Sequence, residues 1–297
     1  MAETTSIAWA DMVFNPWEGC QKVGPGCDFC YAEARNIRFT GGANWGPGAP
    51  RRRTSLANWV KPHKWNRAAL ADGASPRVMC GSLCDVLDNE APQVWRNDLW
   101  DTIRATPALR YMLITKRIGN ALDMLPPSWT AQWDGTIVPN QFAHVGIIAT
   151  TVTQDEIDRD APKLFKVPAA WWGFSLEPQL GPIVLPRCVV DQARAFPGRV
   201  WIISGGESYQ PQIHESRADV RGYNLKWAFS MKAQCALAGI AYFQKQLGAR
   251  PFMLPTPTLP LSGTVVPYVC DRDPDAGANI NDWPVPLRVQ EFPAPLR

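Results

Sequence analysis

Seven short apolar runs, separated by longer polar or amphipathic stretches, dominate the pattern of this sequence. They cover residues 12–14, 77–80, 110–115, 144–148, 171–175, 200–204 and 240–243. The spacing leaves room for a helix between most neighbouring runs, which is typical of repeated βα units around a mainly parallel sheet. Between the last two runs, apolar residues recur at intervals of three or four and predict a helix with one face on the sheet. These residues are Leu225, Ala228, Met231, Cys235 and Ala238. The sequence therefore predicts an α/β fold, a partial or complete (β/α) TIM-like barrel.

The length and composition fit one large domain. The chain has 297 residues, of which 46% are hydrophobic, and α/β barrels of this size commonly form a single core. We expect the barrel to occupy residues 1–250. Residues 251–297 begin with a proline-rich stretch containing Pro251, Pro255, Pro257 and Pro260. Because proline interrupts helices and removes donors from a sheet, we expect this segment to be irregular and to pack on the barrel or extend from it.

The sequence carries no signal for secretion or membrane insertion. Its first residues lack a basic region followed by an apolar run, and no stretch approaches about 18 uninterrupted apolar residues. The eight cysteines are sparse for a chain of this length, which favours a reducing compartment over a disulfide framework. We therefore expect a cytoplasmic protein with no membrane partner.

Three cysteines, Cys20, Cys27 and Cys30, lie close together near the start of the chain. Three thiolates on a four-iron cluster would leave one iron open to an exchangeable ligand, whereas structural zinc normally takes four protein ligands. Glycines between the first two thiols give a turn-forming loop. A helix beginning near Cys27 and Cys30 would place both sulfurs on one side of its first turn and favour a negatively charged cluster. The alternatives are a zinc knuckle completed by a distant His or Cys, and unrelated buried thiols.

Polar or chemically useful residues follow most of the apolar runs. In α/β barrels the loops at the carboxyl ends of the strands meet at one face and form the active site. Some of these side chains will simply be solvated or cap helices. The residues are Ser82, Asp85, Thr115, Lys116, Arg117, Thr150, Thr151, Ser175, Glu177, Gly205, Gly206, Glu207, Ser208, Gln244 and Lys245.

Among these residues, Lys116, Asp85 and Gln244 are the candidates for substrate contact. Lys116 with its basic neighbour could bind a carboxylate or phosphate, although paired basic residues at a helix start are often just exposed. Ser175 and Glu177 are candidates for a cofactor, because a carboxylate beyond an apolar strand can accept both hydroxyls of a ribose. The alternative for Glu177 is a helix cap or an ion pair.

The cysteine segment resembles the radical S-adenosylmethionine (SAM) superfamily, in which an aromatic residue stands just before the last ligand, as Phe29 does here. The spacing differs, because six residues rather than three separate Cys20 from Cys27. A closer resemblance is to a phage-borne and prophage-borne three-cysteine-motif family, over residues 5 to about 250. It is carried by Asn15-Pro16-Trp17, Gly19-Cys20, Gly26-Cys27 and Cys30-Tyr31-Ala32-Glu33.

The resemblance implies that Cys20, Cys27 and Cys30 hold a [4Fe-4S] cluster whose open iron chelates SAM. An electron from a donor such as flavodoxin or ferredoxin then cleaves the sulfonium bond, and the resulting radical abstracts hydrogen from a substrate. The segment Gly205-Gly206-Glu207 resembles the Gly-Gly-Glu element that holds the amino group of SAM. Here it follows the sixth apolar run rather than the second, so Glu207 could equally bind substrate, or be a solvent-facing acid after a turn.

The phage association implies a nucleic-acid substrate, such as an already modified base (thymine) in phage DNA, with Arg51, Arg52 and Arg53 on phosphate. The formal charge of +3 does not itself demand nucleic acid, and a solvated loop is the plainer interpretation of this basic run. A radical SAM enzyme for a small metabolite or peptide, and a zinc-stabilised, non-catalytic nucleic-acid-binding protein, remain as alternatives.

Other residues with chemical potential give weaker signals. Cys80 and Cys84 could supply further ligands or a redox pair, although buried strand-end cysteines are the commoner case. His63, His144 and His214 occur singly, without the spacing of a metal site or of a base that activates a nucleophile. The sequence therefore gives little support to hydrolytic catalysis.

Overall fold

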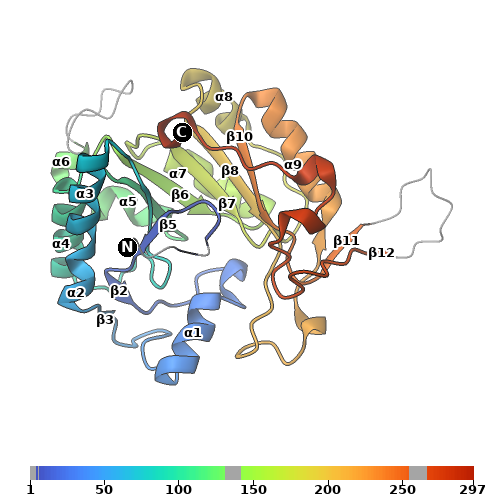
Figure 1. The fold of residues 1–297 in the computed structure, drawn as a ribbon, viewed down its shortest axis with the longest axis horizontal. Helices are drawn as coiled ribbons and strands as arrows, with labels where there is room; N and C mark the ends of the chain where they lie inside the picture. Colours follow the sequence, from blue (N-terminus) through green and yellow to red (C-terminus); the bar gives the residue numbers. More distant parts are fainter. Residues whose placement is uncertain (1–4, 6, 131–141, 254–265) are drawn as a thin grey trace.

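The computed structural model describes residues 5, 7–130, 142–253 and 266–297, and its centre is a seven-stranded parallel sheet. The sheet order is β1-β4-β5-β6-β7-β8-β10, and every neighbouring pair is parallel. The sheet curls into a half-barrel surrounded by helices (Figure 1). The prediction of an α/β partial barrel is thus confirmed. The strands are β1 Met12–Phe14, β4 Arg77–Cys80, β5 Arg110–Thr115, β6 Val145–Thr150, β7 Trp172–Leu176, β8 Val200–Gly205 and β10 Ala241–Gln246.

Helices connect the strands, as the spacing of the apolar runs predicts. They are α1 Tyr31–Thr40, α2 Leu56–Trp59, α3 Lys61–Asp72, α4 Gln93–Arg104, α5 Ala121–Met124, α6 Pro127–Thr130, α7 Gln154–Leu164, α8 Arg187–Ala195 and α9 Leu225–Ala238. The predicted apolar stripe of α9 is buried at Leu225, Ala228, Met231 and Cys235.

Within the described ranges, two small sheets and several short 3-10 helices accompany the central sheet. One small sheet pairs β2 Trp17–Glu18 with β3 Arg52–Arg53, and the other joins β9 Tyr223–Asn224, β11 Pro251–Met253 and β12 Val266–Pro267. The 3-10 helices are η1 Pro25–Cys27, η2 Ile118–Asn120, η3 Arg217–Asp219, η4 Ile280–Asp282, η5 Val285–Leu287 and η6 Ala294–Leu296.

The two faces of the central sheet carry separate apolar clusters, because successive side chains of a strand point to opposite faces. Val78 of β4 and Ile202 of β8 join residues of α4 and α7 in the larger cluster, on the helix-covered face. Met79 and Trp201, their neighbours in sequence, lie in the second cluster, against both ends of the chain. The core thus packs both faces of the sheet and holds the strand ends in a fixed arrangement.

Residues 289–291 of the carboxyl-terminal segment lie along the outer edge of β10. The backbone N–H of Gln244 donates to the carbonyl of Val289 (2.9 Å), and that of Glu291 donates to the carbonyl of Tyr242 (2.9 Å). The indole of Trp201 donates to the carbonyl of Glu291 (2.8 Å). Pro255, Pro257 and Pro260, on which the prediction of irregular chain partly depended, lie outside the described residues. The domain boundary at residue 250 stays a prediction.

None of the helices in residues 5, 7–130, 142–253 and 266–297 has both the length and the apolar character needed to span a bilayer.

Candidate functional site

The cysteine segment lies across the carboxyl ends of the central strands. A Cβ placed on Gly26 would come within 2.9 Å of the Val152 side chain, two residues after β6, and 3.4 Å of Cε of Lys116, the residue after β5. A Cβ on Gly24 would come within 2.7 Å of the Glu156 carboxylate at the start of α7. Glycine at these positions lets the loop pass this close to the strand ends.

The three cysteines come from successive short elements of this loop. Cys20 follows β2, Cys27 ends η1, and Cys30 is the N-cap of α1 with extended backbone. The helix expected after Cys30 is present. Cys27 lies outside it, however, so the expectation that Cys27 and Cys30 share its first turn is wrong, since the chain forms a separate 3-10 turn at Pro25.

The loop supplies three thiols, the donor type that iron-sulfur clusters take. The three thiols are free and belong to one segment that lies against a cation, Lys116. Burial by itself lowers the pKa of the Lys116 ammonium, but Cys30 and Cys27, followed by Asp85 and Cys20, raise it above its ordinary value. As placed, no three or more His, Cys, Asp or Glu side chains of the described residues form a metal-binding group. The assignment of the three cysteines as ligands stays a prediction.

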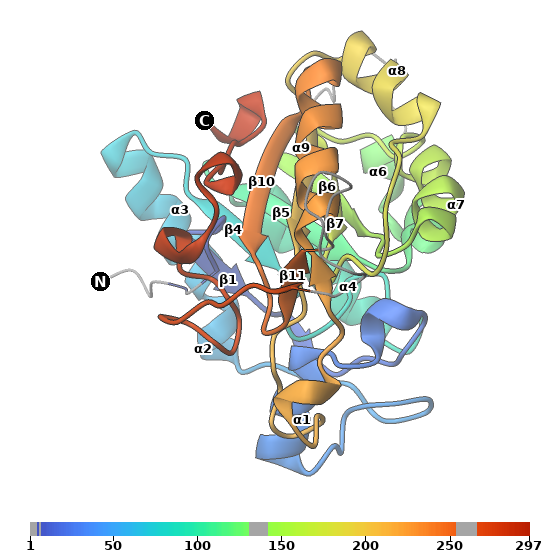
Figure 2. The same cartoon turned by 90° about the vertical axis from the view of Figure 1, so that its right-hand side faces the viewer.

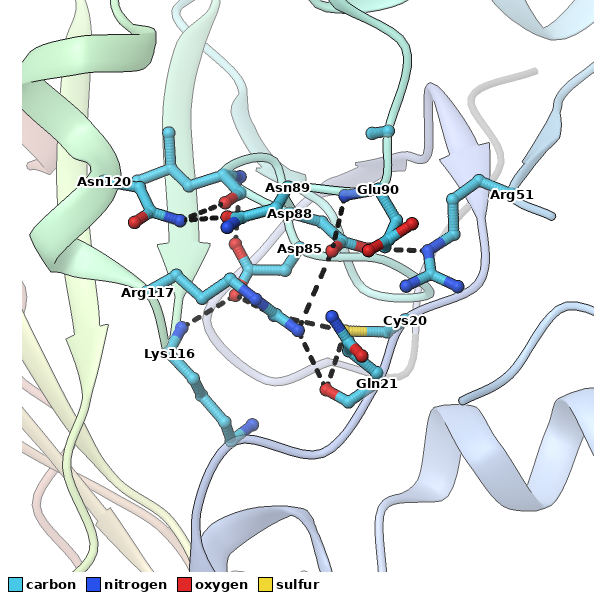
Figure 3. Close-up of polar contacts among 12 residues, drawn as sticks. Cys20, Gln21, Arg51, Asp85, Asp88, Asn89, Glu90, Lys116, Arg117 and Asn120 are labelled. Atoms are coloured by element: carbon cyan, nitrogen blue, oxygen red, sulfur yellow. Dashed lines mark hydrogen bonds and ion pairs between the residues drawn. The ribbon is translucent and has the colours of Figure 1, made fainter. Parts of the chain in front are cut away.

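Asp85 organises a buried polar network beside Cys20 (Figure 3). Its carboxylate accepts hydrogen bonds from the Thr115 hydroxyl (2.8 Å), the Lys116 backbone N–H (2.9 Å) and Nη1 of Arg117 (3.0 Å). Arg117 in turn donates to Sγ of Cys20 (3.3 Å). Asp85 thus holds the end of β5, and through Arg117 it orients the first cysteine. Its contact with substrate stays a prediction, and its oxygens already accept bonds from within the protein.

The surroundings of Cys20 favour its protonated form in the metal-free protein. Burial, with a smaller contribution from Asp85, raises the pKa of the Cys20 thiol to about 11, and the Arg117 guanidinium opposes this shift. The nitrogen Nη2 of Arg117 also donates to the carbonyl of Gln21 (2.9 Å), so the same side chain holds the backbone next to Cys20. The Lys116 side chain extends away from this network, toward the cysteine segment (Figure 3).

The basic run does not present three cations to solvent. Nε of Arg51 lies 2.6 Å from the Asp88 carboxylate, and both side chains are 0% exposed. Arg52 pairs with Glu18, and Arg53 pairs with Asp98 (2.6 Å). The expectation that Arg51 contacts a DNA phosphate is wrong, because its guanidinium is buried in the protein. Arg52 is 56% exposed and can still meet a ligand.

Glu177 and Ser175 lie at the carboxyl end of β7. Glu177 forms an ion pair with Lys245 of β10, and a Cβ on Gly205 would lie 3.5 Å from the Glu177 side chain. Ser175 is buried, and its carbonyl accepts a bond from the Thr151 backbone (3.1 Å). The structure therefore brings Ser175 and Glu177 together with Gly205. Of the alternatives for Glu177, its side chain forms the ion pair. A role in binding ribose or SAM stays a prediction.

Glu207 is buried, so the alternative of a solvent-facing acid is excluded. Its carboxylate accepts from Nε of Arg221 (2.6 Å) and from the backbone N–H of Arg221 (3.0 Å), and it lies 3.2 Å from Nε2 of His214. Neither partner was identified from the sequence, because both lie in an irregular stretch with no periodic pattern. Their only signal was their position shortly after the Gly-Gly-Glu element.

Gln244 is fully buried within β10. Its amide accepts from the Tyr242 hydroxyl (2.5 Å) and donates to the carbonyl of Gln246 (2.8 Å). These bonds tie the side chain to its own strand. Its contact with substrate stays a prediction, because both ends of the amide already bond to groups of the protein.

The remaining candidates have structural partners. His144 lies 3.0 Å from the carbonyl of Ile103, and burial lowers the pKa of its imidazole to about 4. Cys80 and Cys84 are buried free thiols, and burial raises the pKa of each. At neutral pH these groups are therefore neutral and packed in the core.

Fold and site together define an α/β half-barrel protein with a three-cysteine loop across the carboxyl ends of its strands. The chain belongs to the family described as Protein of unknown function (DUF5131), which matches residues 4–256. A search of curated proteins finds no match.

Two solved structures with a similar fold are variants of spore photoproduct lyase. One carries a Tyr-to-Phe substitution and matches with a TM-score of 0.51 and 12% identity over 82% of this chain and 78% of that chain. The other carries a Cys-to-Ser substitution and matches with a TM-score of 0.50 and 13% identity over 82% of this chain and 79% of that chain. At this level of identity the likeness concerns the fold.

Proposed function

We propose that the protein is a radical SAM enzyme in which Cys20, Cys27 and Cys30 hold a [4Fe-4S] cluster. The observation that carries the proposal is the position of the cysteine loop, with Gly26 against Lys116 and Val152 at the carboxyl ends of β5 and β6. In α/β barrels this edge holds the reacting groups. The half-barrel, which is the scaffold of radical SAM enzymes, supports the same conclusion.

When bound, the cluster and SAM supply a carbon radical that abstracts a hydrogen atom from the substrate. The residues of this chain prepare the site for them. Arg117 orients the Cys20 sulfur, and the amino-terminal end of α1, capped by Cys30, favours an anionic group. Lys116 lies against the loop that carries the three thiols, and Cys30, Cys27, Asp85 and Cys20 raise the pKa of its ammonium, so a positive charge faces the site.

For SAM we propose the adjoining strand ends, with Ser175, Glu177 and the backbone of Gly205 and Gly206 as its contacts. These residues follow β7 and β8, and Glu177 already faces a cation, Lys245. Because Glu177 is paired in this structure, binding to ribose hydroxyls would require it to exchange Lys245 for the ligand. An external donor such as flavodoxin or ferredoxin would supply the electron.

For the substrate we propose a base in DNA, specifically a thymine that has already been modified. The support is the resemblance of the cysteine motif to phage-borne proteins, and exposed Arg52 is available for phosphate. Mass analysis of nucleosides from cells that make the protein together with the phage genome tests this choice. Nucleosides that are identical with the parent and the Cys27→Ala variant would favour a small metabolite or peptide as substrate.

Anaerobic reconstitution tests the cluster itself. We expect the parent to bind about four irons per chain and to form 5′-deoxyadenosine from SAM with a reductant. Cys27→Ala should lose most of the iron and all of the SAM cleavage. Cys188→Ala is the matched control, because Cys188 is a half-buried free thiol on α8, which lies at the opposite end of the molecule from α1 (Figures 1 and 2).

Two results would contradict the proposal. Iron binding and SAM cleavage that do not depend on Cys27 would remove the basis for the ligand assignment. Colourless protein with about one zinc per chain and no SAM cleavage would indicate the zinc-stabilised, non-catalytic alternative.

A further inference from the structure

Three side chains of the loop between β8 and β9 form a compact charged group. Glu207, at the end of β8, accepts hydrogen bonds from Arg221 and lies within bonding distance of His214. The side chains of Glu207 and His214 are 3% and 0% exposed. We call Glu207, His214 and Arg221 the loop anchor.

The loop anchor contacts the cysteine segment on its other side. The imidazole of His214 stacks on the ring of Phe29, with centroids 4.3 Å apart and an angle of 15° between the planes. The Arg221 guanidinium lies 5.1 Å from the centroid of the same ring. Arg221 also donates to the carbonyl of Pro25 (2.7 Å) and lies 3.5 Å from the Asp28 carboxylate.

These contacts join two segments that are far apart in the sequence. In Figures 1 and 2 the loop after β8 and helix α1 lie at the same end of the molecule. Phe29 directly precedes Cys30, and Pro25 begins the 3-10 turn that ends at Cys27. The loop anchor therefore contacts the chain beside two of the three cysteines.

The carboxylate of Glu207 determines the geometry of the loop anchor. One oxygen faces the His214 ring and the Arg221 backbone, and the other accepts from the Arg221 guanidinium. A charge-assisted pair of this kind is strong and directional, and removing one member leaves the other buried without its partner. The position of the Arg221 guanidinium, and hence its bond to the carbonyl of Pro25, thus depends on Glu207.

We propose that Glu207, through His214 and Arg221, is a positioning residue that holds Cys27 and Cys30 in place for the cluster, rather than a ligand of the SAM amino group. This inference rests on the proposed function, and it gives the Gly-Gly-Glu element a new role. A Cβ on Gly206 would lie 2.3 Å from the carbonyl oxygen of Leu247, so packing against the end of β10 also favours glycine at this position.

Hydrogen exchange of the metal-free protein tests the loop anchor without the cluster. The amides of Cys27 and Asp28 bond to the carbonyls of Gly24 and Pro25 (2.9 and 3.3 Å). In Glu207→Gln we expect these amides to exchange about tenfold faster than in the parent, with β8 and β10 unchanged. Glu215→Gln is the matched control, since Glu215 is an exposed glutamate of the same loop.

Reconstitution with iron and SAM then separates the two roles of Glu207. If Glu207 positions the loop, Glu207→Gln binds iron more slowly, and its fully loaded fraction binds SAM as the parent does. Unchanged loop exchange and unchanged iron uptake, with SAM affinity lowered at least tenfold, would overturn the proposal. Because exchange is measured without metal, a parent that binds no iron would refute the proposed function and leave the test of the loop anchor valid.

A second variant covers the case in which Glu207→Gln does not fold. Phe29→Leu removes the ring that His214 and Arg221 contact, and it leaves the buried charged group intact. It should give the same faster exchange at Cys27 and Asp28. Exchange at the parent's rate in Phe29→Leu would also overturn the proposal.

Discussion

Arg51 and Asp88 form an ion pair that is fully enclosed by the protein. Nε of Arg51 lies 2.6 Å from the carboxylate, and Nη1 donates to the carbonyls of Gly46 (3.2 Å) and Ala49 (2.8 Å). A buried guanidinium with these partners fixes the loop that follows α1. The role of Arg51 is therefore structural. The loop that it fixes supports the segment that carries Cys20, because the backbone N–H of Gly46 donates to the carbonyl of Cys20 (2.8 Å).

Replacement of Arg51 by methionine should destabilise the protein strongly. The change removes the nearer cation of the buried Asp88 carboxylate and leaves it with the more distant Arg117, at 3.8 Å. The loss of one member of a buried pair typically costs about 3–5 kcal/mol. Arg52→Met is the matched control, because Arg52 is 56% exposed and exposed pairs contribute about 0–1 kcal/mol. Chemical denaturation of both variants measures the difference. Equal stabilities would show that the Arg51 pair contributes no more than a surface pair.

The sequence could not distinguish Arg51 from its two neighbours. Three consecutive arginines look alike, and the choice of which one is buried depends on β3 pairing with β2 and on an aspartate 37 residues away. The same limit applies to Asp85. Its position after a strand was predicted, but its bond to Arg117, which reaches Cys20, depends on how two strand ends meet.

Sequence patterns predict the strands of this fold better than the roles of the residues that follow them, such as Glu207 after β8. All seven strands of the central sheet were identified, with bounds within three residues, because a buried parallel strand is a continuous apolar run. The function of residues beyond the strand was harder to predict. Glu207 was recognised by its resemblance to a motif, whereas the partners that occupy its carboxylate, His214 and Arg221, come from irregular chain without periodicity.

Gly206 gives a test of what the two glycines of this element do. A Cβ at this position would lie 2.3 Å from the carbonyl oxygen of Leu247, so Gly206→Ala should force β8 and β10 apart. Overpacking of this kind typically costs about 1–3 kcal/mol. Gly181→Ala is the matched control, because nothing lies within 4 Å of a Cβ there, and we expect a change within about 0.5 kcal/mol.

Denaturant unfolding of the two alanine variants, without metal or SAM, gives the comparison. A Gly206→Ala protein as stable as Gly181→Ala would show that the ends of β8 and β10 can move apart at no cost in stability. The glycine would then have to be explained by close approach of a ligand. Loss of stability in the metal-free protein would instead support packing as the reason for glycine.

At the scale of the whole molecule, an open half-barrel has two edge strands, β1 and β10. An exposed edge with unpaired backbone groups invites pairing with other chains. In this structure residues 289–291 lie along β10 and bond to Gln244 and Tyr242. Trp283 and Leu287 add to the cluster formed by Tyr223, Leu225 and Leu247. The proline-rich composition predicted irregular chain, but it carried no information about which edge that chain would cover.

Truncation tests whether the carboxyl-terminal segment protects the barrel edge. A chain ending at residue 250 loses the bonds to Gln244 and Tyr242 and the burial of Trp283 and Leu287, so we expect a lower unfolding midpoint and aggregation during purification. A chain ending at Pro293 keeps Val289 and Glu291 on the edge and is the matched control. Soluble yield, light scattering and the denaturation midpoint measure the outcome. If the shorter chain is as soluble and as stable as the longer one, residues 1–250 form an independent domain, and the segment that follows is dispensable for the fold.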